Sequence, residues 1–73
     1  MEIKQLEYFR AIVDAGTISG AARTLHMTQP PISYQIKMLE EELGVRLFVR
    51  GAKNITLREA GKVLYIRATS LLT

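Results

Sequence analysis

The sequence predicts a mainly α domain that contains four helical segments and one short β-hairpin. Two observations indicate this class. In four segments, apolar residues recur every three or four positions, which is the spacing of one face of an α-helix. Between the third and fourth segments, two short apolar runs are joined by a turn that contains glycine, as in a hairpin. A chain of 73 residues is long enough for one small core.

Composition excludes several classes of function. The chain has no cysteine and a single histidine, His26, so disulfides and thiolate metal sites are excluded. One histidine is also too few for a histidine metal site, and it would have to serve alone in any Ser-His-Asp triad. No apolar run reaches the length of a membrane span, and no secretory signal opens the chain. We therefore expect no catalytic residue, no metal, no cofactor in this domain and no membrane contact.

The net charge of +3 is unevenly distributed. Residues 29–45 hold one cation and three acids, a balance of −2, whereas residues 46–73 hold six cations and one acid, a balance of +5. A basic excess in one part of a chain favours a polyanionic partner, although such clusters also occur simply as solvated surface.

The first helix is expected over residues 3–15. Its apolar residues have helical spacing, and Gly16 follows as a natural stop. These apolar residues are Ile3, Leu6, Phe9, Ile12 and Val13. We interpret this helix as part of the core and nothing more.

The second helix is expected within residues 17–25, where Ser19 is the preferred N-cap and Thr17 is the alternative. Its small residues allow another helix to approach closely. A short helix containing Ala22, a tight connection through His26, and a helix with Ile32 in its first turns form a helix-turn-helix pattern. We interpret His26 as a turn residue or a phosphate contact.

The third helix, within residues 28–44, has two unlike faces. The apolar face consists of Ile32, Ile36, Leu39 and Leu43. The opposite face carries Pro30, Ser33, Tyr34, Lys37 and Glu41. This helix therefore anchors itself by one face and presents small and polar groups on the other.

The two ends of this helix also differ. Pro30 and Pro31 lack the N–H groups that a capping side chain at Thr28 would normally bind, so Thr28 is expected to contribute little to capping. Gln29, which precedes a proline, is expected at the boundary of the helix. A positive helix end favours an anion such as a phosphate. Residues 40–42 are three glutamates shortly before Gly44, which is expected to end the helix. Three acids at a helix C-terminus would repel a polyanion, although for stability alone a solvated face is the favoured interpretation. If nucleic acid is bound, the N-terminal half of this helix enters it.

The hairpin is expected to pair residues 46–50 with residues 54–57. Attached to a helix-turn-helix, such a hairpin is a wing. Its tip carries Arg50 and Lys53, flanked by Arg46 and Arg58. These cations would contact the DNA backbone or a minor groove, or else form a solvated turn.

The last helix is expected over residues 58–73, with Thr56 as a capping residue because Thr56 and Glu59 have capping-box spacing. It carries two apolar stripes, and a domain this small can cover only one. We expect the other to bind a second copy, and the chain to be cut from something longer. The predicted dimer interface comprises Ala60, Val63, Leu64, Ala68 and Leu71.

Taken together, these segments resemble the N-terminal DNA-binding domain of LysR-type transcriptional regulators. The matching stretches are LEYFRAIVDAGTISGAARTLHMTQPPIS, Ile36, LEEELGVRLFVR and ITLREAG. The resemblance implies a winged helix-turn-helix domain over residues 1–57 and a long linker and dimerisation helix over residues 58–73. It also implies a C-terminal effector-binding domain outside this chain, through which any small-molecule effector would act.

The resemblance further implies which residues meet DNA. At the helix these are Thr28, Gln29, Pro30, Ser33, Tyr34 and Lys37, and at the wing they are Arg50 and Lys53. The sequence departs from the family at three positions: Arg58 stands where a capping Thr is usual, Tyr34 where Arg or Lys is frequent, and Pro31 where Ala is common.

We therefore expect sequence-specific binding of double-stranded DNA by a homodimer that regulates transcription in the bacterial cytoplasm and associates with the nucleoid through its operator. The recognition helix, about residues 30–43, would lie in the major groove, where a glutamine can pair with adenine. The alternative is a protein-interaction module in which the wing or the last helix binds another protein. The separation of the acids from the basic wing favours DNA.

Overall fold

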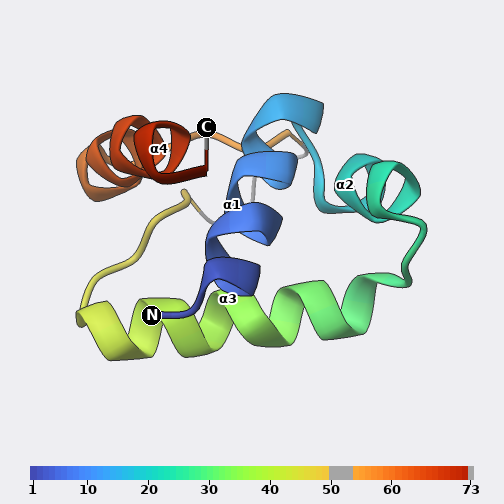
Figure 1. Cartoon of the computed structure of the whole chain (residues 1–73), viewed down its shortest axis with the longest axis horizontal. Coiled ribbons are helices and arrows are strands. Elements are labelled where there is room, and N and C mark those ends of the chain that lie inside the picture. The colour runs from blue at the N-terminus through green and yellow to red at the C-terminus, as the bar shows by residue number, and fades with distance from the viewer. Residues whose placement is uncertain (50–53, 73) are drawn as a thin grey trace.

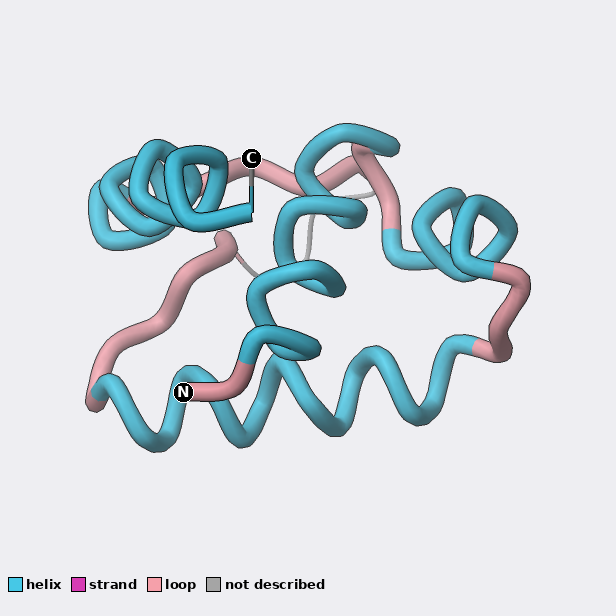
Figure 2. The backbone as a smooth tube through the Cα atoms, in the orientation of Figure 1, coloured by secondary structure: helices cyan, strands magenta, loops and turns pink. Residues whose placement is uncertain are grey.

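The computed structural model describes residues 1–49 and 54–72. Within these residues it contains four helices: α1 (Ile3–Ala15), α2 (Ile18–Leu25), α3 (Gln29–Leu43) and α4 (Glu59–Leu72). α1 is central, and each of the other helices packs against it (Figure 1). α2 also contacts α3, whereas α4, among the described helices, contacts α1 alone. Where the structure describes the connections between these helices, they are loops and turns (Figure 2).

α1 supplies the centre of the core. Leu6, Phe9 and Ile12 are buried, as their spacing predicts, but Ile3 at the start of the helix is exposed. Gly16 ends the helix in the left-handed conformation, at φ 83°, and its N–H donates to the Ile12 carbonyl at 2.9 Å. A residue with a Cβ is disfavoured at such a φ, so the predicted stop at Gly16 is confirmed.

α2 begins one residue after Thr17, whose Oγ1 accepts a hydrogen bond from the Gly20 N–H at 2.9 Å. The preference for Ser19 as the cap was therefore wrong. Starting at Thr17 lets Ile18 become the first helical residue and pack against the core. Gly20 makes room for this cap, because a Cβ there would lie 2.9 Å from the Thr17 hydroxyl.

The turn between α2 and α3 is set by His26. Among the non-glycine residues that the structure describes, only His26 has a positive φ, 56°. Its left-handed conformation lets the N–H of Met27 reach the Ala22 carbonyl at 2.9 Å, which closes the helix end. His26 is exposed, in agreement with the prediction of a turn residue.

α3 lies across α1 with Ile32, Ile36 and Leu39 buried. The predicted stripe ends one turn early, because Leu43 is exposed. Only α1 and α2 contact α3 among the described helices, and its last turn projects past α1 (Figure 1). Gly44 then ends the helix at φ 72°, as predicted.

The segment after α3 returns to the core. Leu47 and Phe48 are buried, and the rings of Phe9 and Phe48 lie 5.5 Å apart between centroids. Phe48 forms an antiparallel bridge with Leu57, flanked by hydrogen bonds from Val49 to Thr56 and from Arg58 to Leu47. The two limbs of the predicted hairpin thus meet in one isolated bridge, and no strand is formed in the described residues. The turn at 50–53 lies outside them.

α4 begins at Glu59, and the carbonyl of Arg58 accepts its first hydrogen bond, from Lys62, at 3.0 Å. The expected cap at Thr56 was wrong, because the Thr56 carbonyl accepts a hydrogen bond from the Val49 N–H and the two residues that follow Thr56 are not helical. Tyr65 ties α4 to α1 by donating from its hydroxyl to Asp14 Oδ1 at 2.6 Å. This hydrogen bond to the carboxylate raises the pKa of the Tyr65 phenol above its ordinary value.

The apolar residues of α4 divide differently from the two stripes that the sequence predicts. Ala68 is fully covered by its own chain, and Ala60 and Leu64 pack against the core. Ala68 therefore cannot contact a second copy, which corrects its place in the predicted dimer interface. The exposed apolar side chains of α4 are Val63, Ile66 and Leu71, whose exposed fractions are 55%, 67% and 66%.

Candidate nucleic-acid interface

The side of α3 that faces away from the core is exposed from its first turn to its fourth. At about 100° per residue, the residues opposite the buried stripe fall on one side of the helix. The structure leaves all of these exposed, with Tyr34 at 59%. They are Pro30, Ser33, Tyr34, Lys37 and Glu41. The predicted helix residues therefore share one accessible surface.

The start of α3 adds Thr28 and Gln29 to this surface. Gln29 is the first helical residue, one position earlier than expected, and Pro30 and Pro31 follow it. Within the described residues, the Thr28 side chain makes no hydrogen bond that caps α3, as predicted from the two missing N–H groups. Thr28 and Gln29 are both exposed, and the first turn contains no acid. Their polar groups stand at the positive end of the helix.

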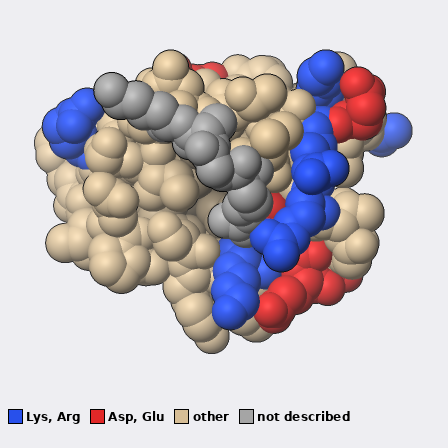
Figure 3. Space-filling view, turned by 180° about the vertical axis from the view of Figure 1, so that it is seen from behind, with Lys and Arg blue, Asp and Glu red and all other residues tan. Residues whose placement is uncertain are grey.

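Cations extend the surface toward the segment that follows α3. Lys37 and Arg46 line one groove with Ser33 and with the apolar side chains of Phe48 and Val49. Seen from behind, lysine and arginine side chains gather in a band down one side of the molecule, with acids beside it (Figure 3). The predicted wing residues Arg50 and Lys53 lie outside the described residues, whereas the flanking Arg46 and Arg58 are exposed.

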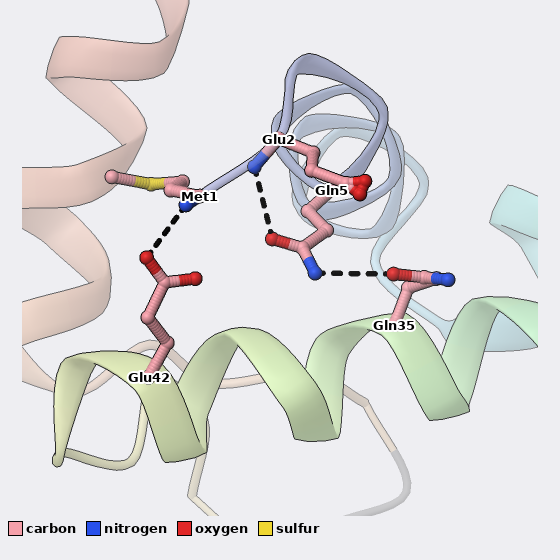
Figure 4. Close-up of polar contacts among 5 residues, drawn as sticks. All are labelled: Met1, Glu2, Gln5, Gln35 and Glu42. Carbon is pink, nitrogen blue, oxygen red and sulfur yellow. Dashed lines mark hydrogen bonds and ion pairs between the residues drawn. The ribbon is translucent and has the colours of Figure 1, made fainter.

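The three glutamates at the end of α3 have different surroundings. Glu40 is only 6% exposed, and its Oε2 accepts a hydrogen bond from the Leu47 N–H at 2.8 Å. Glu42 pairs with the Met1 ammonium group at 2.6 Å (Figure 4), and Glu41 is exposed. The alternative of a uniformly solvated face is therefore wrong for Glu40, which connects α3 to the chain beyond it.

A second polar connection joins α3 to α1. Gln5 is 6% exposed, and its Nε2 donates to Gln35 Oε1 at 3.1 Å. Gln5 Oε1 in turn accepts from the Glu2 N–H at 3.1 Å, at the start of α1 (Figure 4). This pair was not among the residues that the sequence predicts to be functional. One signal was present: Gln35 lies about 60° from Ile32 around the helix, at the edge of the buried stripe.

In the described part of the chain, no group of three or more His, Cys, Asp or Glu side chains is arranged to hold a metal ion. No helix among residues 1–49 and 54–72 is long and apolar enough to cross a membrane.

The chain matches a known protein family. The sequence model of a family described as "Bacterial regulatory helix-turn-helix protein, lysR family" matches residues 3–62. Among curated relatives, the HTH-type transcriptional regulator TfdT of Cupriavidus pinatubonensis is 46% identical over 72 residues. The HTH-type transcriptional regulator BsdA of Bacillus subtilis is 49% identical over 73 residues. Each alignment covers 99% of this chain, but only 32% of TfdT and 25% of BsdA.

The fold also matches solved structures. The chain superposes on the crystal structure of the BenM_DBD/catB site 1 DNA complex with a TM-score of 0.95 and 42% sequence identity. That match covers 99% of this chain and 81% of the other. The arrangement of α1 to α4 is therefore one that has been seen before in a protein crystallised with DNA.

Proposed function

Because the chain belongs to the lysR family of bacterial regulatory helix-turn-helix proteins, we propose that it binds double-stranded DNA in a sequence-specific way and thereby regulates transcription. α3, which includes the predicted recognition helix of about residues 30–43, enters the major groove with its N-terminal half. The chain acts as a homodimer, and no residue of it has a catalytic role.

One observation carries this proposal: the N-terminal half of α3 is exposed, has no acid in its first turn, and begins with a threonine not engaged in capping. A helix start of this kind suits a phosphate. Gln29, Ser33, Tyr34 and Lys37 then face the groove, where they contact base edges and phosphates. The related BenM_DBD structure, solved with DNA, supports the same use of the fold.

The wing is the second contact. Arg50 and Lys53 contact the DNA backbone from this wing. The support comes from the described residues before and after them: Phe48 forms a bridge with Leu57, and Phe48 lines the same groove as Lys37 and Arg46. Cations in this position strengthen binding to any sequence, because phosphates carry no sequence information.

Residues 1–57 form the winged DNA-binding unit and residues 58–73 the linker and dimerisation helix. The interface differs from the one that the sequence predicts: it uses Val63, Ile66 and Leu71, which the fold leaves exposed, with Ala60 and Leu64 at its margin. Two copies joined through α4 hold two recognition helices at a fixed separation.

The relatives are about three to four times longer than this chain, as the covered fractions show. A small-molecule effector would bind to a domain outside these 73 residues, and this domain needs no cofactor. The regulator works in the cytoplasm, associated with the nucleoid through its operator.

The test is to measure DNA binding by the 73-residue chain, using fluorescence anisotropy at a series of salt concentrations. The probes are a duplex enriched by the chain from a random-sequence library and a scrambled duplex of the same composition. We expect tighter binding to the enriched duplex, and an affinity that falls steeply as salt rises because phosphate contacts release counterions. Binding to neither duplex, or equal binding to both, would refute the proposal.

A further inference from the structure

The buried face of α3 holds the helix on the core through apolar contacts. Ile32, Ile36 and Leu39 make up this face. Apolar burial is non-directional, so it fixes the depth of the helix better than its rotation about its own axis. The rotation of α3 determines where the side chains on its exposed side lie. A displacement of about 1 Å in one of these side chains is enough to break a hydrogen bond to a base edge.

Two polar residues lie on opposite edges of this apolar stripe. Gln35 and Glu40 are five positions apart, so they project about 140° from each other around the helix, with the stripe between them. Gln35 accepts from Gln5 of α1, and Glu40 accepts from the N–H of Leu47. A directional contact on each edge opposes rotation in both senses.

Gln5 is itself held in one orientation. Its Oε1 accepts from the Glu2 N–H, and this N–H can only donate. The oxygen of the Gln5 amide must therefore point toward Glu2, which leaves the NH₂ group pointing toward Gln35 (Figure 4). The backbone at the start of α1 thus determines where the side chain of Gln35 is held.

We propose that Gln5 and Gln35 are positioning residues, whose hydrogen bond sets the rotation of α3 and so determines how well the chain discriminates between DNA sequences. The inference rests on the proposed function. Gln5 is buried and acts only through Gln35. Attraction to phosphates tolerates a small rotation of the helix, whereas hydrogen bonds to base edges do not. Loss of the pair therefore lowers discrimination more than affinity.

The experiment measures the ratio of affinities of the 73-residue chain for the enriched and the scrambled duplex. Gln5→Met and Gln35→Met keep the shape of the side chain but remove the hydrogen bond. We expect each to lower the ratio about tenfold, the worth of one well-placed base contact. Binding to the scrambled duplex should change by less than about twofold, because phosphate contacts supply it.

Two controls separate positioning from other roles. Gln35→Glu keeps an acceptor for Gln5, so it should retain the ratio while its added charge weakens binding to both duplexes. Tyr65→Phe removes the hydrogen bond between α4 and α1, away from α3, so it should change thermal stability but not the ratio. Because Gln35 is only half-buried, its variants test the proposal even where Gln5→Met impairs folding.

Three results would overturn the inference. An unchanged ratio in Gln35→Met would show that the hydrogen bond does not affect discrimination. If the affinity ratio falls in both Gln35 variants but not in Gln5→Met, Gln35 contacts a base directly. If the ratio falls equally in Tyr65→Phe, the effect is a general loss of stability. If the unmodified chain enriches no sequence at all, the proposed function fails first, and the inference fails with it.

Discussion

Two glutamines of α3 show how position decides the role of one residue type. Gln29 is exposed in the first turn, next to a threonine whose side chain does not cap the helix, and its amide is available to an external partner. Gln35, six residues later, lies at the edge of the buried stripe and its amide oxygen is engaged by Gln5. At the residue scale, the first is suited to read a base and the second to hold the helix.

The role of Gln29 is tested by Gln29→Ala. We expect this change to lower affinity for the enriched duplex by about 1–3 kcal/mol, because a bidentate contact to a base is worth that much. Affinity for the scrambled duplex should stay nearly constant. The measurement is fluorescence anisotropy with both duplexes, and Lys37→Ala serves as the comparison, since loss of a cation weakens binding to both. If Gln29→Ala weakens both duplexes equally, Gln29 contacts only the backbone.

At the scale of the element, α4 packs closely against the rest of the domain at a position that has no side chain. Gly61 is buried, and a Cβ there would collide with the carbonyl group of Leu47. Ala68 is fully covered, and Tyr65 bonds to Asp14 of α1. Small residues on one side of α4 thus bring it close to the segment that leads to the predicted wing.

Gly61→Ala tests this close approach. In a helix, replacing glycine by alanine normally stabilises by about 1 kcal/mol. Here the added methyl group meets backbone rather than a flexible side chain, and overpacking costs about 1–3 kcal/mol. We therefore expect a net loss of stability in urea unfolding. Ser70→Ala, on the exposed side of the same helix, should instead be neutral or slightly stabilising. A stabilised Gly61→Ala would mean that α4 packs less closely than described.

For the whole molecule, the feature that the single chain does not account for is the exposed apolar side of α4. Val63 and Ile66 lie one turn apart, and each is more than half exposed. Soluble proteins usually cover a continuous apolar strip, and a second copy can do so with a two-fold pair of helices. Such a pair would match a DNA site with two half-sites one or more helical turns apart.

This assembly is tested by Val63→Glu combined with Ile66→Glu. Both side chains are exposed, so we expect a folded chain that sediments as a monomer at micromolar concentration, where the unmodified chain is a dimer. It should bind a duplex with two half-sites far more weakly. Lys4→Glu on α1 changes the net charge by the same amount and should remain dimeric. An unmodified chain that is monomeric, with full affinity for a single half-site, would contradict the assembly.

Much of the fold could be predicted because it depends on local chemistry. Several of these features act within one or two turns of a helix. They are the spacing of Phe9 and Ile12, the helix ends at Gly16 and Gly44, and the prolines that leave the Thr28 side chain without an N–H to cap. The exposed side of α3, with its candidate DNA contacts, follows from the same periodicity. The resemblance of the chain to a known family could also be predicted, because the order and spacing of the matching segments are properties of the sequence.

Tertiary structure alone decided which polar groups are engaged and which apolar groups are covered. Glu40 looks like its two acidic neighbours until the chain folds back and offers it the N–H of Leu47. Gln5 and Gln35 are 30 residues apart and meet only because α3 crosses α1. Ala68 and Val63 belong to similar apolar spacings, yet α1 covers one side of α4 and leaves the other exposed. Periodicity gives the faces of a helix, but its neighbours in space determine which face is buried.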